Sequence, residues 1–532
     1  MLNISEKYSF SLLWLDNDSD EYFELDDKTI EDINISLLMN DLKKNIKGNL
    51  IKLMEKIPVS VTTIEYRQDI LTDFINNNML LDTLKNTFDR CSEIKNMIKF
   101  AFESEATLYN LLKRIDEVAD VMNLSENICS ILKNSNIKSK GLLELQGFIE
   151  STIDSDVYQN FKQDIYHIKD MDEGVHGLKV GINFDNNLKP VEAIVLSLED
   201  KPFKYSRKLK KISKVVSYGL GELKAIPRKL FAPESLAMPE ALNNIEKIIA
   251  PAMKQLIAFC DQFNSSLLSI YVPLTTEITF YEIALKIYDK MINNGYSLCK
   301  PKIVNEDETM IQGLYNINLA YDMADKGKND EMVYNDFNID SKGNIFILTG
   351  ANRGGKTTFT QSIGQIYWFA QLGFYIPAKE ATIKLIDKLY LHFPAEEIAT
   401  INYGRLGEEC QRFSEIFSEM TNKSLLLMNE SFDGTSHLES LIIATDILKA
   451  LQLLGATVVF NTHLHELGEK INELNNNRVP LFVNLVSGSI NDVQSFKVKE
   501  GIPLGQSYAK DIAIKYGVSY EQLITSSPAK PI

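Results

Sequence analysis

The sequence has few cysteines, a deficit of basic residues and no long apolar run. Without a C-x-x-C pair, its five scattered cysteines predict neither a disulfide framework nor a zinc site: Cys91, Cys129, Cys260, Cys299 and Cys410. The 56 Lys and Arg stand against 72 Asp and Glu, a net charge of -16. This balance excludes nucleic-acid binding through overall charge and restricts any DNA contact to a local patch.

Targeting segments are not predicted either. No apolar run approaches the roughly 20 residues that a membrane span needs. The stretch from Met1 to Asp16 lacks the charge and apolar pattern of a signal peptide. We therefore expect a cytoplasmic protein in a reducing compartment, with no membrane contact.

The first 300 residues are predicted to be mostly helical, interrupted by a small β element. Between residues 37 and 168, apolar residues recur at helical spacing, and one predicted helix face consists of Leu84, Phe88, Cys91, Ile94 and Ile98. The period changes to two over residues 178–184 and 191–195, with a turn at Asn186-Asn187. Beyond Tyr321, short apolar runs alternate with amphipathic stretches, which is typical of an α/β unit.

The most specific motif follows the apolar run from Ile345 to Leu348, which predicts a buried strand. The next residues match the pattern G-x-x-x-x-G-K-[ST] in full. Glycines let backbone N–H groups surround phosphates, and a helix starting near Lys356 points its positive end at them. We expect Lys356 to reach the outer phosphates and Thr357 to bind Mg²⁺. The predicted nucleotide-binding residues are Gly350, Ala351, Asn352, Arg353, Gly354, Gly355, Lys356, Thr357 and Thr358.

Two later strands complete the predicted site. The run from Leu425 to Met428 ends in Asn429-Glu430, where P-loop ATPases place a metal-binding Asp and a Glu that accepts a proton from the attacking water. We predict that Glu430 is catalytic and that Asn429 joins Thr357 at the metal. Because an amide brings no negative charge, we expect weaker Mg²⁺ binding and slower turnover.

A histidine follows the third strand of this kind, from Thr457 to Phe460. His463 comes just past the strand end, at the same predicted edge of the sheet as Glu430. A histidine in this place can hydrogen-bond a γ-phosphate and act as a switch. We therefore predict that His463 works with Glu430 and Lys356 in catalysis.

Several segments together carry a family resemblance. They are TGANRGGKTTF (349–359), PAKEA (377–381), LLLMNESFDGTS (425–436), NTHLHEL (461–467) and GIPLGQSYAKDIAIKYGVS (501–519). In letters, order and spacing they resemble the ATPase domain of the MutS family of DNA mismatch-repair proteins. The resemblance covers roughly residues 309–524. The segment IEYRQDILTDF (64–74) and the long helices resemble the family's helical core and lever domains.

The resemblance implies a fold class, cofactors and partners. The implied class is α + α/β: a long-helix core and lever region over 1–308, with a small β element and a clamp-like tip near 176–230, then a P-loop, ABC-type α/β ATPase domain over 309–532. ATP and Mg²⁺ are the implied cofactors. A homodimer through the ATPase domains, double-stranded or branched DNA and a repair protein are the implied partners. The segment from Gly404 to Glu409 stands where the family's signature loop would complete the partner's ATP site.

Departures from the family pattern indicate a divergent branch. Ala351 replaces a Pro, Arg353 a Met, Asn429 an Asp and His437 a Thr, and the usual Ser-Thr pair of the signature loop is absent. The family's mismatch reader inserts the Phe of a Phe-x-Glu motif into DNA. Here that motif lies inside predicted helical or ATPase segments, at Phe148, Phe280, Phe413 and Phe417. We therefore expect no mismatch-reading domain, and no Smr nuclease.

Outside the predicted ATPase domain, one stretch is strongly basic. Residues 204–229 hold nine Lys or Arg, with only Glu222 against them. They are candidates for phosphate contacts with DNA, although a solvated basic face explains the composition equally well. The predicted function is ATP-dependent DNA binding, in which hydrolysis in a dimer gates a DNA clamp in repair or recombination.

Two alternative functions are also compatible with the sequence. The first is an ATP-driven protein-interaction switch or scaffold with weak hydrolysis and no direct DNA binding, which suits the acidic balance. The second is an ATP-binding protein that barely hydrolyses, because Asn429 weakens the metal site.

Overall fold

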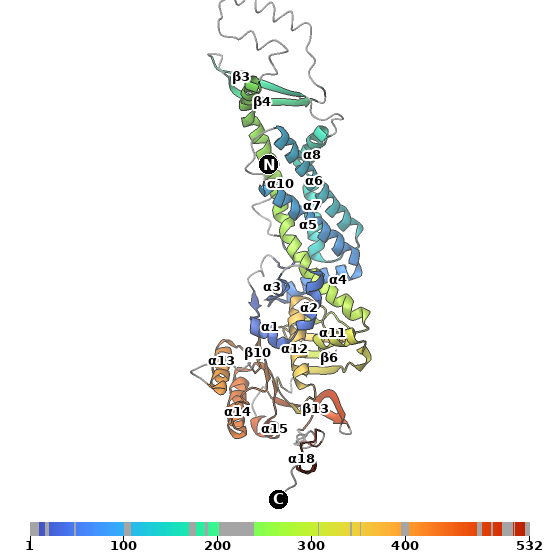
Figure 1. Cartoon of the computed structure of the whole chain (residues 1–532), viewed down its shortest axis with the longest axis vertical. Helices are drawn as coiled ribbons and strands as arrows, with labels where there is room; N and C mark the ends of the chain where they lie inside the picture. The colour runs from blue at the N-terminus through green and yellow to red at the C-terminus, as the bar shows by residue number, and fades with distance from the viewer. Residues whose placement is uncertain are drawn as a thin grey trace, which may run out of the picture. The chain divides into compact units, whose positions relative to one another are not determined.

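The computed structural model describes residues 10–15, 21–46, 49–100, 108–169, 177–186, 190–199, 201, 239–306, 308–340, 343–351, 353–394, 404–475, 481–490, 493–502, 514 and 516–526. The chain, shown in Figure 1, mixes helices and sheets and is mostly helical, as the sequence predicts. It forms two compact units. Unit 1 combines Met1–Phe10 with Asn77–Ile278, and unit 2 combines Ser11–Asn76 with Thr279–Ile532. The boundary at 308/309 stays a prediction.

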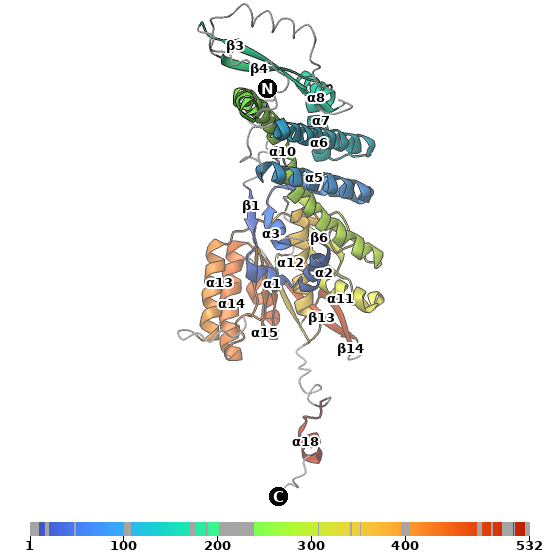
Figure 2. The same ribbon diagram turned by 45° about the horizontal axis from the view of Figure 1, so that its top comes forward.

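Unit 1 is built from long helices. They are α5 (Asn78–Phe100), α6 (Leu108–Asn134), α7 (Lys140–Ile153), α8 (Asp156–Lys169) and the part of α10 (Pro239–Asn293) that ends at Ile278. Figure 2 shows α5, α6 and α7 side by side. The predicted face of Leu84, Phe88, Cys91, Ile94 and Ile98 is buried along α5, which confirms the helical periodicity. Among the described helices, none combines the length and apolar character of a bilayer-crossing segment.

The predicted β element of unit 1 is a hairpin. Strands β3 (Gly177–Phe184) and β4 (Pro190–Glu199) pair antiparallel, with Leu178 opposite Leu198 and Ile182 opposite Ala193. The strands lie where the sequence period changes from helical spacing to two. The basic stretch 204–229 lies outside the described residues.

Unit 2 is organised around a six-stranded sheet with the order β10-β11-β12-β8-β13-β14. Its strands are β8 (Ile345–Gly350), β10 (Leu389–His392), β11 (Leu425–Asn429), β12 (Thr457–Asn461), β13 (Phe482–Ile490) and β14 (Val493–Glu500). The neighbours from β10 to β13 are parallel, and β14 is antiparallel to β13. Three predicted strands, at 345–348, 425–428 and 457–460, are thereby confirmed.

Helices cover both faces of this sheet, which explains its continuous apolar strands. On one face, α13 (Arg405–Glu419) and α14 (His437–Leu454) form a core with Leu426, Met428 and Val458; Figure 2 shows these helices next to each other. On the other face lies α12 (Lys356–Leu372). Gly364 lets α12 approach β11 closely, because a Cβ there would be 3.0 Å from Leu427 Cδ1.

A second, four-stranded sheet has the order β5-β9-β6-β7. Its strands are β5 (Lys302–Val304), β6 (Thr309–Leu314), β7 (Asn335–Ile339) and β9 (Glu380–Lys384). Helix α11 (Ile317–Lys326) connects toward β7. The shorter helices after β12 are α15 (His465–Glu469), α16 (Ile471–Asn475) and α18 (Tyr520–Ser526).

The first part of unit 2 consists of short elements. They are β1 (Tyr22–Glu24), α1 (Asp27–Ile33), α2 (Ser36–Asn45), α3 (Leu50–Met54), β2 (Lys56–Pro58) and α4 (Val61–Asn76). Strands β1 and β2 pair antiparallel. Segments 26–34 and 49–58 are held against α12 by side chains that are spaced along that helix.

Polar groups spaced along α12 hold these segments. Gln361 donates to the carbonyl of Asp32, and Gln365 donates to the carbonyls of Ile33 and Asn34. Trp368 Nε1 donates to the carbonyl of Met54 at 3.1 Å. Gln371 donates to the carbonyls of Pro58 and Ile386. Buried amide and indole groups need such partners, so α12 and the first part of unit 2 depend on each other.

Candidate functional site

The glycine-rich loop between β8 and α12 is shaped by its contact with β13. Gly350 has φ 137°, and a Cβ there would lie 2.8 Å from the carbonyl oxygen of Ser487. At Gly354 a Cβ would lie 2.4 Å from Ser487 Oγ, the hydroxyl that donates to the Gly354 carbonyl. Both positions therefore need glycine, because the loop packs closely against Ser487 of β13.

Lys356 is the first residue of α12 and is buried, with 5% of its surface exposed. Its ammonium donates to the carbonyls of Gly350 (3.0 Å) and Ala351 (3.1 Å), so the side chain bends back over the loop. Burial lowers the pKa of Lys356, and the nearby Glu430 carboxylate opposes this shift. The site thus contains a desolvated cation enclosed by a glycine loop.

The predicted metal pair comes together at the ends of the strands. Thr357 Oγ1 donates to Asn429 Oδ1 at 3.0 Å. Asn461 Nδ2 donates to the same Asn429 oxygen and to Thr357 Oγ1. Asn461 was not predicted from the sequence, although it lies directly opposite Asn429 in the parallel register. Within the described residues, no cluster of three or more His, Cys, Asp and Glu forms a metal site.

Glu430 and His463 form a hydrogen-bonded pair. His463 Nε2 donates to Glu430 Oε1 at 2.7 Å, because a carboxylate only accepts. This hydrogen bond lowers the pKa of Glu430, with burial opposing the shift and Lys356 adding to it. Glu430 is therefore ionised at neutral pH. Its backbone has φ 47°, a left-handed conformation that is unusual outside glycine.

Glu430, His463 and the loop residues from Arg353 to Thr358 line one cavity of about 700 Å³, whereas Gly350, Ala351 and Asn429 are not part of its lining. One side consists of Gly354, Gly355, Lys356, Thr357, Thr358 and Arg353, together with Glu430 and His463. The rest of the lining includes the apolar Leu319, Met323, Met332, Val333 and Phe496, together with the polar Asn316 and Asn335 and the acidic Glu331. The structure thus brings the predicted catalytic residues and most of the predicted loop together. Asn352 lies outside the described residues.

The apolar side of the cavity was not predicted. Leu319 and Met323 belong to α11, Met332 and Val333 to the turn before β7, and Phe496 to β14. No local pattern connects these positions, because each resembles an ordinary core residue in its own segment. The segment from Gly404 to Glu409 starts α13 and adds no described side chain to this cavity.

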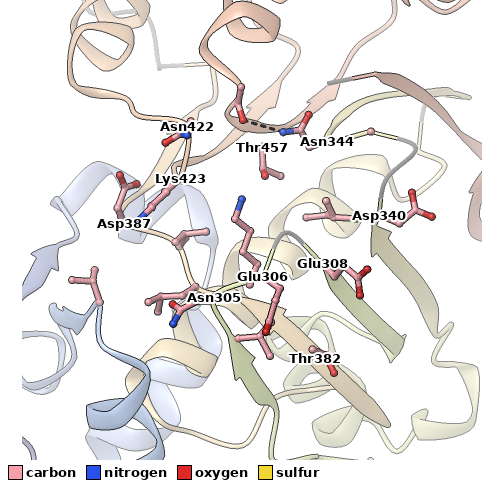
Figure 3. Close-up of a pocket in the computed structure, with 18 of the residues that line it drawn as sticks. Asn305, Glu306, Glu308, Asp340, Asn344, Thr382, Asp387, Asn422, Lys423 and Thr457 are labelled. Carbon is pink, nitrogen blue, oxygen red and sulfur yellow. Dashed lines mark hydrogen bonds between the residues drawn. The ribbon is translucent and has the colours of Figure 1, made fainter. Parts of the chain in front are cut away.

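A larger cavity, of about 1330 Å³, lies at the opposite end of the strands. Asn344 precedes β8, Lys423 precedes β11 and Thr457 begins β12, and all three line this cavity (Figure 3). Its lining carries charges of both signs. The acidic residues include Glu306, Glu308, Asp340 and Asp387, and Lys423 is one of the basic residues. None of the described site residues predicted from the sequence lines it. Ligands of open parallel sheets bind at the carboxyl ends of the strands, so we place the candidate site in the smaller cavity.

A buried histidine lies behind Glu430. His392 ends β10 with 1% of its surface exposed. Its Nε2 donates to the Glu409 carbonyl at 3.0 Å, since a carbonyl only accepts. Its Nδ1 lies 2.8 Å from Ser431 Oγ, whose hydroxyl donates to the His392 carbonyl. Burial, and then the charge of Arg412, lower the pKa of His392 to about 4. The ring is therefore neutral at physiological pH.

We expect this histidine to make unit 2 sensitive to acid. Because the pKa is about 4 in the folded chain and 6.5 in the reference state, the unfolded chain takes up the proton first. The free energy of unfolding is therefore highest above pH 6.5, where His392 is neutral in both states. It falls as the pH is lowered toward 4, and the loss is about 2 kcal/mol at pH 5. Urea unfolding followed by tryptophan fluorescence measures this, because both tryptophans, Trp14 and Trp368, belong to unit 2.

The control for this prediction is the variant His392→Gln. Its free energy of unfolding is expected to depend less steeply on pH between 7.5 and 5 than that of the wild type. The difference in slope isolates His392 from His465, whose pKa is also lowered by burial. Equal slopes in the two proteins would contradict a neutral, buried His392.

Comparisons with known proteins show which family this chain is similar to. The family model described as MutS domain V matches residues 346–524, and the one described as MutS2 N-terminal domain matches residues 59–293. The chain belongs to the MutS family. The first match contains the loop, Glu430 and His463, and the second contains the long helices of unit 1. The resemblance seen in the sequence is therefore confirmed in both halves.

Relatives within the MutS family are distant in sequence. The DNA mismatch repair protein MutS of Clostridium kluyveri is 23% identical over 492 residues, which are 84% of this chain and 55% of that protein. The protein of the same name from Fusobacterium nucleatum is 24% identical over 495 residues, 86% of this chain and 54% of the relative. The protein of this name from Clostridium botulinum is 26% identical over 502 residues, which are 84% of this chain and 52% of that protein. The chain thus spans about half the length of the curated relatives it matches.

Proposed function

We propose that this chain binds ATP with Mg²⁺ in the 700 Å³ cavity and hydrolyses it to ADP and phosphate. The observation that carries the proposal is the convergence of Lys356, Thr357, Glu430 and His463 on one cavity at the carboxyl edge of a parallel sheet. A buried ammonium, a glycine loop at a helix N-terminus and a carboxylate–histidine pair form the chemistry that a nucleoside triphosphate requires.

The loop and the apolar side suit the two ends of the nucleotide. Phosphate oxygens would accept the hydrogen bonds that Lys356 now donates to the Gly350 and Ala351 carbonyls. Backbone N–H groups at the start of α12 would add hydrogen bonds to the same oxygens. The side lined by Leu319, Met323 and Met332 suits a flat, largely apolar base.

The oxygen donors at the strand ends fit a magnesium ion. Thr357 Oγ1 and Asn429 Oδ1 are oxygen ligands of the kind that Mg²⁺ prefers. Asn461 Oδ1 is buried and has no hydrogen-bond partner, so it is available to a metal-bound water. When bound, Mg²⁺ would offset the charge of the phosphates. All three side chains are neutral, so the protein adds no charge of its own at this point.

Glu430 is the proposed general base. Its carboxylate is ionised and lies on the cavity, where it orients a water molecule and accepts its proton. His463 holds the carboxylate through Nε2 and also lines the cavity, so it responds to what occupies the γ-phosphate position. Lys356 stabilises the charge that develops on the phosphoryl oxygens.

At the level of the whole protein, we propose that ATP binding and hydrolysis in a homodimer gate a clamp on double-stranded or branched DNA. The relatives named DNA mismatch repair protein MutS support a role in DNA repair. The basic residues 204–229 are the candidate DNA contact. The second candidate, a protein-interaction switch with weak hydrolysis, is favoured by the neutral Asn429 and the net charge of -16.

The deciding experiment is ATP hydrolysis with homoduplex, mismatched and four-way-junction DNA at two salt concentrations. Stimulation by one DNA form, lost at high salt, is expected for a DNA-gated ATPase. Neutralising Lys208, Lys210 and Lys211 should remove the stimulation and leave the DNA-free rate unchanged. Turnover that does not respond to any DNA would favour the protein-interaction switch. No turnover and no nucleotide binding would overturn the proposed site.

Restoring a charge beside the metal should strengthen its binding. In Asn429→Asp, the carboxylate keeps the same shape and accepts the same hydrogen bonds from Thr357 and Asn461. Because an added negative charge close to a divalent ion favours its binding, the Mg²⁺ concentration for half-maximal turnover should fall by about tenfold. The measurement is a Mg²⁺ titration of the ATPase rate at fixed ATP. An unchanged midpoint would remove Asn429 from the metal site.

A further inference from the structure

The turn that carries Glu430 is held in an unusual conformation. Glu430 and Phe432 both have positive φ, 47° and 67°. Residues other than glycine keep such a backbone only where their surroundings fix it. Phe432 is fully buried and Ser431 nearly so. The N–H of Glu430 donates to the Asn461 carbonyl at 2.8 Å, which anchors one end of the turn to β12.

The other end of the turn is fixed by a carboxylate from α13. Glu409 is 5% exposed, and its Oε2 accepts from the backbone N–H of Phe432 at 2.6 Å. This N–H is two residues beyond Glu430 and is buried. A buried N–H without an acceptor is costly, so the Glu409 carboxylate fixes where the chain goes after Glu430.

The same residue also fixes the histidine beneath the turn. The backbone carbonyl of Glu409 accepts from His392 Nε2. The hydroxyl of Ser431 in turn contacts both Nδ1 and the carbonyl oxygen of His392, each at 2.8 Å. The His392 ring stacks on Phe432 with 5.2 Å between centroids. Glu409 therefore holds the turn directly through its side chain and indirectly through His392.

We propose that Glu409 and His392 are positioning residues that connect the start of α13 to the orientation of the Glu430 carboxylate. The inference rests on the proposed function, because Glu430 needs a defined direction only if it acts on a water molecule in the cavity. Glu409 lies in the second turn of α13, which begins at Arg405. A displacement of this helix end shifts the acceptor of the Phe432 N–H and thereby Glu430. Nucleotide binding involves neither residue, since neither lines the cavity.

The test separates turnover from binding in the full-length chain. In Glu409→Ala, kcat for ATP hydrolysis is expected to fall about 10- to 30-fold, while the Kd for a fluorescent ATP analogue with Mg²⁺ changes less than threefold. Glu409→Gln keeps an oxygen that accepts from the Phe432 N–H and should restore kcat to within about threefold of the wild type. The matched control is Glu415→Ala, which removes an exposed glutamate from the same helix.

Ser431→Ala provides an independent variant if Glu409→Ala does not fold. It removes only the hydroxyl between His392 and the turn, and we expect a smaller loss of kcat with unchanged nucleotide affinity. Wild-type kcat in Glu409→Ala and Ser431→Ala would overturn the inference and leave the proposed ATPase intact. Equal losses of kcat and affinity would also overturn it, because they indicate a general structural role. If the wild type itself binds no nucleotide, the proposed function fails first.

Discussion

Glu430→Gln is expected to lower ATP hydrolysis by at least 100-fold while nucleotide binding is retained. Glutamine keeps the size of the side chain and an oxygen for the hydrogen bond from His463, but it does not accept a proton from water. General-base catalysis contributes about 10²- to 10⁴-fold, so the loss should appear in kcat. Single-turnover hydrolysis and titration with a fluorescent ATP analogue measure the two quantities.

A second glutamate–histidine pair provides the matched control. Glu466 accepts from His437 Nε2 at 2.8 Å, and this hydrogen bond lowers its pKa, as His463 does for Glu430. Glu466 does not line the cavity. The variant Glu466→Gln should therefore hydrolyse ATP at the wild-type rate. If the two variants lost ATP hydrolysis to a similar extent, or if Glu430→Gln hydrolysed ATP normally, Glu430 would not be the general base.

The second large effect is expected on stability, from Gly373→Ala at the end of α12. Gly373 has φ 85°, and an added Cβ would lie 2.6 Å from Arg67 Cβ and 3.2 Å from the Ile64 carbonyl oxygen on α4. The left-handed backbone costs about 1–2 kcal/mol for a residue with a Cβ. Forcing α4 away from α12 adds about 1–3 kcal/mol. We expect a total loss of roughly 2–5 kcal/mol in the free energy of unfolding of unit 2.

Gly455→Ala separates the two contributions. Gly455 ends α14 with φ 81°, nearly the same backbone conformation, but a Cβ there would meet only Asn422 Cβ at 3.6 Å. This variant should lose only the backbone contribution. Urea unfolding of both variants, followed by tryptophan fluorescence, gives the difference. Equal losses would show that α4 moves aside at little cost.

The meeting of the residues that we propose as catalytic could be predicted from the sequence because each follows its own strand. Lys356, Glu430 and His463 come after three apolar runs, and parallel strands place their carboxyl ends at one edge. The position of each residue after its strand therefore predicts that the three side chains meet. The helix face of Leu84 and Phe88 was predictable for a similar reason, since its spacing is local.

Contacts between distant segments could not be predicted in this way. Phe496 and Met332 reach the cavity from segments on either side of the loop in sequence, and neither carries a motif. Phe432 and Glu409 are joined by a hydrogen bond to a backbone N–H, which leaves no trace in residue type. The packing of residues 26–58 on α12 was missed for the same reason. A helix pattern indicates a buried face but not the segment that covers it.

The hydrogen bonds along α12 limit how the chain can be shortened. A fragment cut at residue 309 would keep Gln365, Trp368 and Gln371, which are at most 2% exposed, but lose the carbonyls of residues 32–58. The Gln365 amide and the Trp368 indole would lose these acceptors, and Gln371 would keep only the Ile386 carbonyl. The indole of Trp368 would also add an apolar patch that favours aggregation. Crystallisation or binding studies of the nucleotide site alone therefore need a fragment that joins residues 11–76 to 279–532.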